Sequence, residues 1–344
     1  MPRIPAFGTA HDVAVTTLVD NLVDLCLPGA ETVRRYSVES GDPLLAEHGL
    51  ALLIDLKEAP LSPRRARTRG TTAGTRILWD AGFTGVALPE NMRRMGIDPH
   101  TINKIALSHG HNDHFGAMTR VLGMVVGPPP ATVWPGDVTH AQVGDWIRKR
   151  RVPLIAHPDA FCERWSVLRD GRKYGPWSAP RGEWEAAGAE IILSDGPYQL
   201  APGCWLTGEV PRRSFERIGT PPTEVCPLGD GWVHDPVRDD QALVINVRTK
   251  GLVVLSGCAH AGIVNTVNYA REISGVSEIC AIIGGFHLVG ASDDDCKRTV
   301  EHVSSFHPQL VAPTHCTGFK AQMQFASRMP DQFVVGSVGT TYLF

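Results

Sequence analysis

The chain alternates short apolar runs with segments of mixed polarity, and this pattern predicts buried strands separated by helices and turns. The apolar runs are rich in Val, Ile and Leu and are bounded by turn-forming residues. The predicted strands are Val13–Val19, Leu50–Leu56, Arg76–Trp79, Lys104–Leu107, Ala242–Val247 and Leu252–Leu255. Helices are predicted over Asp145–Arg151, Ile263–Ile273 and Asp293–Phe306. Because strands and helices alternate in both halves, the pattern favours an α/β or layered α+β fold.

Three longer segments interrupt this pattern, near residues 57–76, 148–177 and 211–237. The first is rich in Arg between two predicted strands, which indicates either a solvated hairpin loop or an anion-guiding rim. The other two contain Trp165, Trp177 and Trp232, and loops of this length in a compact protein are commonly functional. We therefore expect one domain over residues 1–344, with the second and third segments as lids or substrate walls.

Composition and charge exclude several classes of protein. The 344 residues carry 33 Lys and Arg against 36 Asp and Glu, and this near-balance provides neither a nucleic-acid footprint nor a polybasic membrane surface. No apolar run is long enough for a membrane span, and the first residues lack the apolar core of a secretory signal. The 8 cysteines form no C-x-x-C pair, so we expect reduced thiols in a cytoplasmic protein.

The strongest chemical signal is the stretch Ala106-Leu-Ser-His-Gly-His-Asn-Asp-His-Phe115, which directly follows a predicted strand. It supplies four strong metal donors, His109, His111, Asp113 and His114. Without a cation between them, a carboxylate and three imidazoles at the end of a buried strand would carry a large desolvation cost. Imidazole and carboxylate together suit zinc, manganese or iron rather than calcium or magnesium. The stretch therefore predicts a metal centre.

The pattern His-x-His-x-Asp-His resembles the signature of the metallo-β-lactamase fold superfamily. Ile77-Leu-Trp-Asp-Ala-Gly82 resembles the first motif of that superfamily, which implies that Asp80 orients a metal ligand or the loop backbone. The resemblance covers nearly the whole chain and implies a four-layer αββα sandwich of two similar halves. The metal ligands would lie at one edge, where the two sheets meet.

Further stretches resemble a subfamily described as dihydropterin-methyl ribofuranosylaminobenzene-phosphate synthase. They are Thr17–Asn21, Ala46–Leu50, Ala156–Phe161, Asp240–Leu243, Ser256–Gly262, Gly284–Leu288 and Pro313–Thr317. Many sequences carry that name in organisms unlikely to need the pterin, so the subfamily is a firmer expectation than the product. Asp20 and His48 lie in two of these stretches and are candidates for supporting or substrate-contacting residues, although the sequence assigns them no chemical role.

The resemblance also implies metal ligands in the second half. His315 follows a predicted strand where the superfamily has its last metal histidine, and His260 follows another strand tip just before a helix. Cys258 stands where a bridging Asp is usual, and it could be either a zinc-bound thiolate or a buried neutral thiol. The usual Gly-His-Thr-Pro-Gly motif is missing, and Glu209 stands at the position of the histidine in that motif. Either Glu209 or His260 takes that role, or one site is weakened, so the number of metals is left open.

These residues predict a metal-dependent hydrolase that uses a zinc-bound hydroxide. One or two zinc ions per chain are expected, with manganese or iron as alternatives; such a metal lowers the pKa of its bound water to about 7. Asp113 would ligate one metal and hold the attacking water, and His287 or His157 would protonate the leaving group. For the two latter histidines, a structural role in the core is the competing interpretation. The arginines favour an anionic small molecule as substrate, and the tryptophans favour an aromatic one.

Other functions on the same residues stay open at this point. A synthase or transferase would activate a carbon nucleophile or a pterin at the same metal site. A diiron redox protein is less favoured, because such members of the fold have Glu at the position of His111 and carry a flavin domain. A non-catalytic binding module is less favoured because the first-half ligand set is complete. We expect no nucleic-acid or membrane partner, and the oligomeric state is open, with a homodimer as one option.

Overall fold

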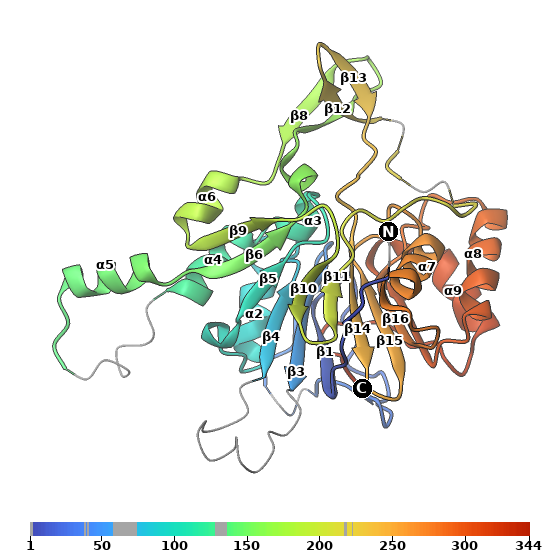
Figure 1. The fold of residues 1–344 in the computed structure, drawn as a ribbon, viewed down its shortest axis with the longest axis horizontal. Coiled ribbons are helices and arrows are strands. Elements are labelled where there is room, and N and C mark those ends of the chain that lie inside the picture. Colours follow the sequence, from blue (N-terminus) through green and yellow to red (C-terminus); the bar gives the residue numbers. More distant parts are fainter. Residues whose placement is uncertain are drawn as a thin grey trace.

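The computed structural model describes residues 3–37, 39, 41–57, 74–127, 136–216, 219–221 and 223–344. Two large β-sheets pack face to face, and helices cover the outer face of each (Figure 1). The apolar strands are buried because each large sheet is covered on both faces, which explains their nearly continuous runs of Val, Ile and Leu. The arrangement is the predicted four-layer αββα sandwich.

The first large sheet has eight strands in the order β2-β18-β1-β3-β4-β5-β6-β9. Strands β1, β3 and β4 are antiparallel, whereas β4, β5, β6 and β9 run parallel. Helices α2 (Ala87–Arg94), α4 (Met118–Val126) and α6 (Arg181–Ala186) pack on its outer face. The strands are β1 (Asp12–Val19), β2 (Val33–Arg34), β3 (Ala51–Lys57), β4 (Thr75–Trp79), β5 (Lys104–Ala106), β6 (Val152–Ala156), β9 (Ala189–Leu193) and β18 (Thr341–Leu343).

The second large sheet has six strands in the order β10-β11-β14-β15-β16-β17. Helices α7 (Ile263–Ser274), α8 (Asp293–Ser305) and α9 (Phe319–Arg328) pack on its outer face, at the orange and red side of Figure 1. Its strands are β10 (Tyr198–Ala201), β11 (Cys204–Leu206), β14 (Ala242–Val247), β15 (Gly251–Ser256), β16 (Ile279–Gly285) and β17 (Leu310–Thr314).

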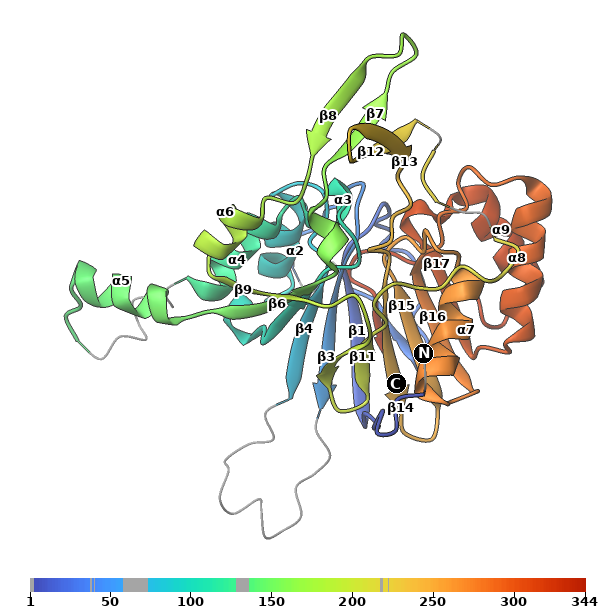
Figure 2. The ribbon, with the colours of Figure 1, turned by 45° about the horizontal axis from the view of Figure 1, so that its top comes forward.

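A small third sheet projects from the sandwich, as Figure 2 shows. It joins β7 (Arg164–Val167) and β8 (Lys173–Trp177) of the second predicted insertion to β12 (Glu224–Leu228) and β13 (Gly231–His234) of the third. Two insertions that are distant in sequence therefore fold as one unit. The sequence did not predict this pairing, because nothing local to either segment identifies the other as its partner.

The described part of the first insertion does not form an anion-guiding rim at the predicted site. Residues 58–73, including its central arginines, lie outside the described residues. Its two ends, Lys57 and Arg76, lie at the ends of β3 and β4 opposite to Asp80, which follows β4 beside the metal loop. Arg76 is paired with Asp55 at 2.6 Å. These two basic side chains are therefore far from the predicted site.

The predicted strands and helices agree with the structure to within a residue or two, except at α5. This helix spans His140–Lys149, and thus begins earlier than predicted from the apolar pattern. A Gln142 side chain near its start accepts hydrogen bonds from the backbone and hydroxyl of Thr139. No helix in the described ranges is both long and apolar enough to cross a membrane.

Candidate metal centre

The metal loop connects β5 to the one-turn helix α3 (Asn112–Phe115) and is held by close backbone contacts. A Cβ atom at Gly110 would lie 2.1 Å from the carbonyl oxygen of Ala160, and one at Gly116 would lie 1.7 Å from that of Phe83. Both positions therefore require glycine. The two glycines bracket the part of the loop that carries His111, Asp113 and His114, and so fix its path.

The first group of donor atoms is formed by three histidines. Nε2 of His109 lies 3.0 Å from Nδ1 of His111, and the ring of His260 is 4.8 Å from each of the other two rings, centroid to centroid. Nε2 of His260 is buried and has no hydrogen-bond partner in the described part of the chain. A metal-ligating nitrogen needs no hydrogen-bond partner from the protein. A buried, unpartnered nitrogen among converging imidazoles is therefore typical of a metal ligand.

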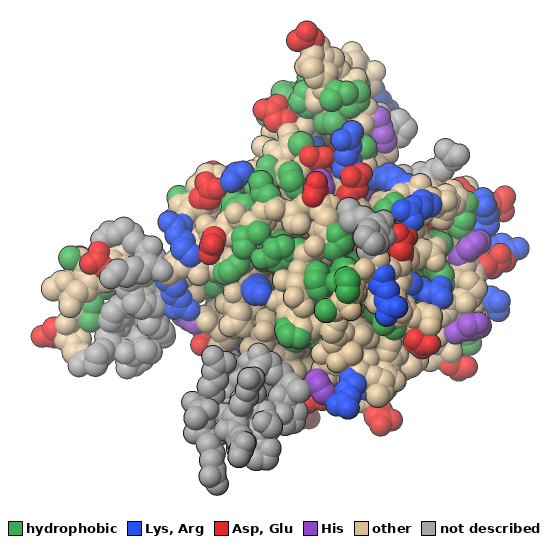
Figure 3. Space-filling model, viewed as in Figure 1, with side chains coloured by type: hydrophobic (Ala, Val, Ile, Leu, Met, Phe, Trp, Pro, Cys, Tyr) green, Lys and Arg blue, Asp and Glu red, His purple; other side chains and the backbone are tan. Residues whose placement is uncertain are grey.

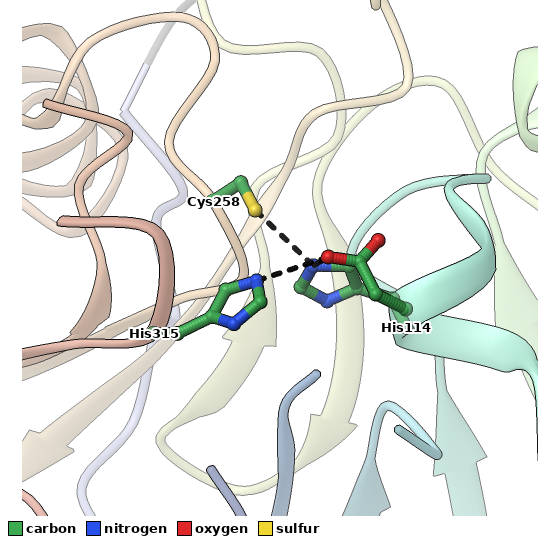
Figure 4. Close-up of side chains that lie close together, drawn as sticks. His114, Cys258 and His315 are labelled. Carbon is green, nitrogen blue, oxygen red and sulfur yellow. Dashed lines mark hydrogen bonds and ion pairs between the residues drawn. The ribbon is translucent and has the colours of Figure 1, made fainter. Parts of the chain in front are cut away.

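The second group is formed by Asp113, His114, His315 and Cys258, whose donor atoms all lie within 4.8 Å of one another. Nε2 of His315 lies 3.2 Å from a carboxylate oxygen of Asp113, and Nε2 of His114 lies 3.1 Å from Sγ of Cys258. Figure 4 shows the three labelled side chains converging from different parts of the chain. Two imidazoles, a carboxylate and a thiol form a donor set suited to zinc.

Cys258 belongs to both groups, because its sulfur also lies within 4.8 Å of donor atoms of His109 and His260. It follows the end of β15, and Gly257 before it approaches the other sheet closely: a Cβ atom there would lie 2.2 Å from Oγ of Ser108. The ends of the two sheets meet at this point. Cys258 thus stands between the two donor groups, where the resemblance predicted a bridging residue.

Burial keeps three of the imidazoles neutral. It lowers the pKa of His109 and of His260 well below the usual value. Burial, with the positive charge of Arg164, lowers the pKa of His111 to about 3. Since a metal binds the neutral form of histidine, these side chains are already in the ligating state near neutral pH.

The other half of the site is charged. Burial lowers the pKa of His114, but the carboxylates of Asp113 and Asp80 outweigh this effect and raise it to about 9. Burial alone would raise the pKa of Asp113, yet His114, His315 and His48 hold it well below its usual range. A buried carboxylate surrounded by imidazoles is stabilised by a positive charge, which either a proton or a metal ion can provide.

Asp80 contacts one of the histidines directly and a second one through Ser108. One of its oxygens accepts hydrogen bonds from Nδ1 of His114 at 2.7 Å and from Oγ of Ser108 at 2.7 Å. Because the Ser108 hydroxyl donates to Asp80, it accepts from Nδ1 of His109, which lies 2.9 Å away. Both histidines therefore hold the Nδ1 proton in a hydrogen bond and direct Nε2 toward the donor groups, and such partners are typical of metal-bound imidazoles.

Arg164, at the start of β7, anchors the third sheet to the metal loop. Its guanidinium donates to Asp235 at 2.7 Å, to Asp239 at 2.5 Å and to the carbonyl of Gly110 at 3.2 Å. Asp239 in turn accepts from the backbone N–H of Gly110 at 2.6 Å. Sequence reasoning missed this network. Arg164 and Asp239 are separated by 75 residues, and neither lies in a metal-ligand motif.

Three of the remaining candidate site residues lie beside the donor groups. The ring of His287 lies 4.2 Å from that of His260, centroid to centroid, at a tilt of 44°, and its Nδ1 is buried without a hydrogen-bond partner among the described residues. His48 lies 3.3 Å from Asp113, and its side chain is 64% exposed. Asp20 is buried and accepts a hydrogen bond from the backbone N–H of His315, so it supports that residue from behind.

Glu209 and His157 do not join the site. Glu209 is exposed and belongs to none of the donor groups found among the described residues. His260, the alternative for the missing histidine, lies in the first donor group. His157 is buried, and its Nδ1 accepts a hydrogen bond from the backbone N–H of Asp159, which caps a short turn. This contact is local to the turn, and a functional role for His157 stays a prediction.

A cavity of about 870 Å³ opens onto the two donor groups. Side chains of both groups line one side of it, together with His48 and His287. The cavity is also lined by one face of α9 and by the segments around it. These lining residues are Leu22, Val289, Phe319, Gln322, Met323, Ala326, Phe333 and Val335.

Comparisons with known proteins agree with this geometry. The family model of the metallo-beta-lactamase superfamily matches residues 70–154. An uncharacterized protein of Methanocaldococcus jannaschii is 30% identical over 295 residues, which cover 86% of this chain and 92% of that protein. A solved structure described as a metal-dependent hydrolase of the beta-lactamase superfamily superposes with a TM-score of 0.66 at 20% identity, over 96% of this chain and 98% of that one.

The chain belongs to the metallo-β-lactamase superfamily and is an enzyme, with a fold that binds divalent metal ions. Within the superfamily it is similar to the 7,8-dihydropterin-6-methyl-4-(beta-D-ribofuranosyl)-aminobenzene-5'-phosphate synthase of Methanocaldococcus jannaschii. The two chains are 28% identical over 296 residues, which cover 85% of this chain and 88% of the synthase. The family and subfamily resemblance predicted from the motifs is confirmed.

Proposed function

We propose that the protein is a hydrolase of small molecules that holds two zinc ions. His109, His111 and His260 would hold one ion, and Asp113, His114 and His315 would hold the other. The observation that carries the proposal is the position of Cys258, whose sulfur is within reach of both donor groups. A thiolate there would contact both ions and take the place of the usual bridging carboxylate.

Bound zinc supplies a nucleophile from water near neutral pH and polarises the oxygen of the bond under attack. The residues of the chain would place the reactants. Asp113 has a carboxylate at the cavity surface that can accept a proton or a hydrogen bond from the attacking water. His48, beside Asp113, carries a pKa raised by its hydrogen bond to that carboxylate, and can contribute positive charge to an approaching substrate.

His287 is suited to protonate the leaving group. It lines the cavity next to His260, and its buried Nδ1 has no hydrogen-bond partner in the described part of the chain. Burial would lower the pKa of His287, but contact with Cys316 outweighs it and raises the pKa. A protonated imidazole at the cavity wall is a suitable general acid. His157, which lies outside the cavity lining, is not needed for this step.

A second candidate function is a synthase reaction, favoured by the 28% identity to the named synthase. It would use the same residues and the same metals, with a carbon nucleophile or a pterin in place of water. The two reactions differ only in what occupies the cavity beside Asp113. Release of product from substrate and water alone supports the hydrolase, and a strict need for a second organic substrate supports the synthase.

Elemental mass spectrometry on the purified protein, alongside hydrolysis of a panel of carboxylic and phosphate esters, tests the proposal. We expect about two zinc ions per chain and zinc-dependent hydrolysis. His111→Ala should retain at most one ion and lose activity. The matched control is His302→Ala, which replaces an exposed histidine on α8 and should leave both quantities unchanged. A folded wild-type protein that binds no divalent metal when supplied with it would contradict the proposal.

A further inference from the structure

One wall of the cavity that contains the metal donors is formed by one face of a helix. Phe319, Gln322, Met323 and Ala326 all line the cavity from α9. Their spacing of three and four residues places them on the same side of the helix. Three of the four are apolar, and the only polar one, Gln322, carries no charge. A bound molecule that reaches the metal donors would lie with its other end along this face.

Apart from its histidines, the described lining of the cavity offers no positive charge to an anionic body. Beyond the side chains of the metal centre, the described residues that line it include no Lys or Arg. A neighbouring cavity of about 440 Å³ shares His287 and Val289 with it, and its described lining includes the carboxyl groups of Glu216 and Asp295 and no Lys or Arg. On the face seen in Figure 3, acidic and basic side chains of the described residues are interspersed rather than separated.

Much apolar surface is left uncovered on this wall. Phe319 is 75% exposed, Val289 70% and Met323 57%, although all three line the same cavity. Exposed apolar side chains that cluster beside polar functional groups are typical of ligand-binding surfaces. The tryptophans of the third sheet do not serve this purpose: Trp165 and Trp232 pack against each other with ring centroids 5.6 Å apart, and neither lines the cavity.

We propose that the substrate carries an uncharged, apolar body that packs against the α9 face, while its reacting group is held at the metal centre. This inference rests on the proposed function, and it decides against a phosphorylated or otherwise anionic body. Phe319 and Met323 are specificity-determining residues in this account. Gln322 provides a neutral hydrogen-bonding group at the middle of the wall.

Matched hydroxamic acids test the inference without knowledge of the substrate. Acetohydroxamate presents only the metal-binding group, 4-phenylbutyrohydroxamate adds an apolar body, and the monohydroxamate of glutaric acid adds a carboxylate. Titration calorimetry on the zinc-loaded protein should show the phenyl compound binding at least about tenfold more tightly than acetohydroxamate, because its ring removes apolar surface from water. The carboxylate compound should gain no affinity over acetohydroxamate.

Variants of Phe319 test whether the gain in affinity comes from the α9 face. Phe319→Ala should lower the affinity for the phenyl compound by about five- to tenfold and leave that for acetohydroxamate unchanged. Phe319→Lys should reverse the preference toward the carboxylate compound. The matched control is Leu228→Ala, which removes another exposed apolar side chain, on the third sheet, and should change no affinity. Zinc content, measured on each variant, should stay at the wild-type value.

The outcomes separate the two proposals. If acetohydroxamate binds but the phenyl group adds nothing, or if the carboxylate compound binds best, the inference about the substrate is wrong and the hydrolase proposal stands. If zinc-loaded protein binds none of the three compounds, the proposed metal centre fails and the inference fails with it. Tighter binding of the phenyl compound that is retained in Phe319→Ala would place the apolar body elsewhere and also overturn the inference.

Discussion

The guanidinium of Arg164 lies 2.5 Å from the carboxylate of Asp239, and both side chains are buried where the third sheet meets the metal loop. Both residues also hydrogen-bond the backbone of Gly110, the residue between His109 and His111. The two insertions that form the third sheet are therefore connected directly to the metal ligands. Their base positions the loop, even though their aromatic side chains do not line the cavity.

Removal of the arginine should affect both folding and metal binding. Arg164→Ala leaves Asp235 and Asp239 buried without their partner, and loss of one member of a buried ion pair costs about 3–5 kcal/mol. Urea unfolding should show this loss, and competition with a chelator should show weaker zinc binding. Arg172→Ala, which breaks an exposed pair with Asp170, is the control and should change neither. Unchanged zinc affinity in a folded Arg164→Ala variant would contradict the positioning role.

Asp80 should control metal affinity without touching the metal. Asp80→Asn keeps the size of the side chain but replaces one acceptor oxygen with a donor that opposes Nδ1 of His114. Loss of such a partner typically weakens metal binding by about 10- to 100-fold. Chelator competition measures the change, and circular dichroism checks that the fold is kept. A zinc affinity equal to that of the wild type would show that His114 needs no fixed orientation.

Two substitutions at Cys258 should have opposite results. Cys258→Asp restores an oxygen ligand that can contact both metals and should keep about two zinc ions per chain. Cys258→Ala removes the shared donor, so the second ion should be lost or bound much more weakly. Elemental analysis after dialysis against metal-free buffer distinguishes the two variants. Full zinc content in Cys258→Ala would mean that the thiol does not join the two groups.

Glu216 should make stability depend on pH. Burial raises its pKa from 4.5 to about 7, although its carboxylate accepts hydrogen bonds from the backbone of Val264 and Asn265. The folded state therefore binds this proton more tightly than the unfolded state, and the stabilisation that it provides is lost as the pH rises from about 4.5 to 7.

Replacement by glutamine should remove this dependence. Relative to Glu216→Gln, the free energy of unfolding of the wild type should fall by about 2 kcal/mol between pH 5 and pH 8. Denaturant titrations of both proteins at several pH values measure the difference and cancel the effects of other titrating groups. Parallel pH profiles would show that the carboxylate is not held in a protonated form.

Much of the first-half site followed from sequence, because its signals are local. His109, His111, Asp113 and His114 lie within one loop, and the strand before them fixes where that loop stands. The second-half positions of His260 and His315 required the family resemblance, since each sits at the end of a separate strand. Glu209 was one of the alternatives for the missing motif histidine, but its side chain is exposed. Position in a motif alone does not determine the direction in which a side chain points.

What the sequence could not provide are contacts between distant segments. Pairing of β7 with β12 and the contact of Arg164 with Asp239 arise only after both sheets are formed. The apolar wall of the cavity also depends on contacts between distant segments. Phe319 and Met323 are ordinary helix positions in the sequence, and only the packing of α9 beside the metal loop gives them a shared cavity with Asp113. The expectation of an anionic substrate was based on the arginines of the insertions and on the subfamily name. Of the described arginines, Arg76 lies far from the site, and Arg164 is paired with Asp235 and Asp239 and does not line the cavity.

X-ray absorption at the zinc edge tests the central claim most directly, because it detects the atoms bound to the metal. If Cys258 joins two zinc ions, the spectrum of the zinc-loaded protein should contain a sulfur shell at about 2.3 Å and a zinc–zinc distance of about 3.5–4 Å. Both should disappear in Cys258→Ala. A wild-type spectrum with only nitrogen and oxygen around an isolated zinc ion would contradict the account.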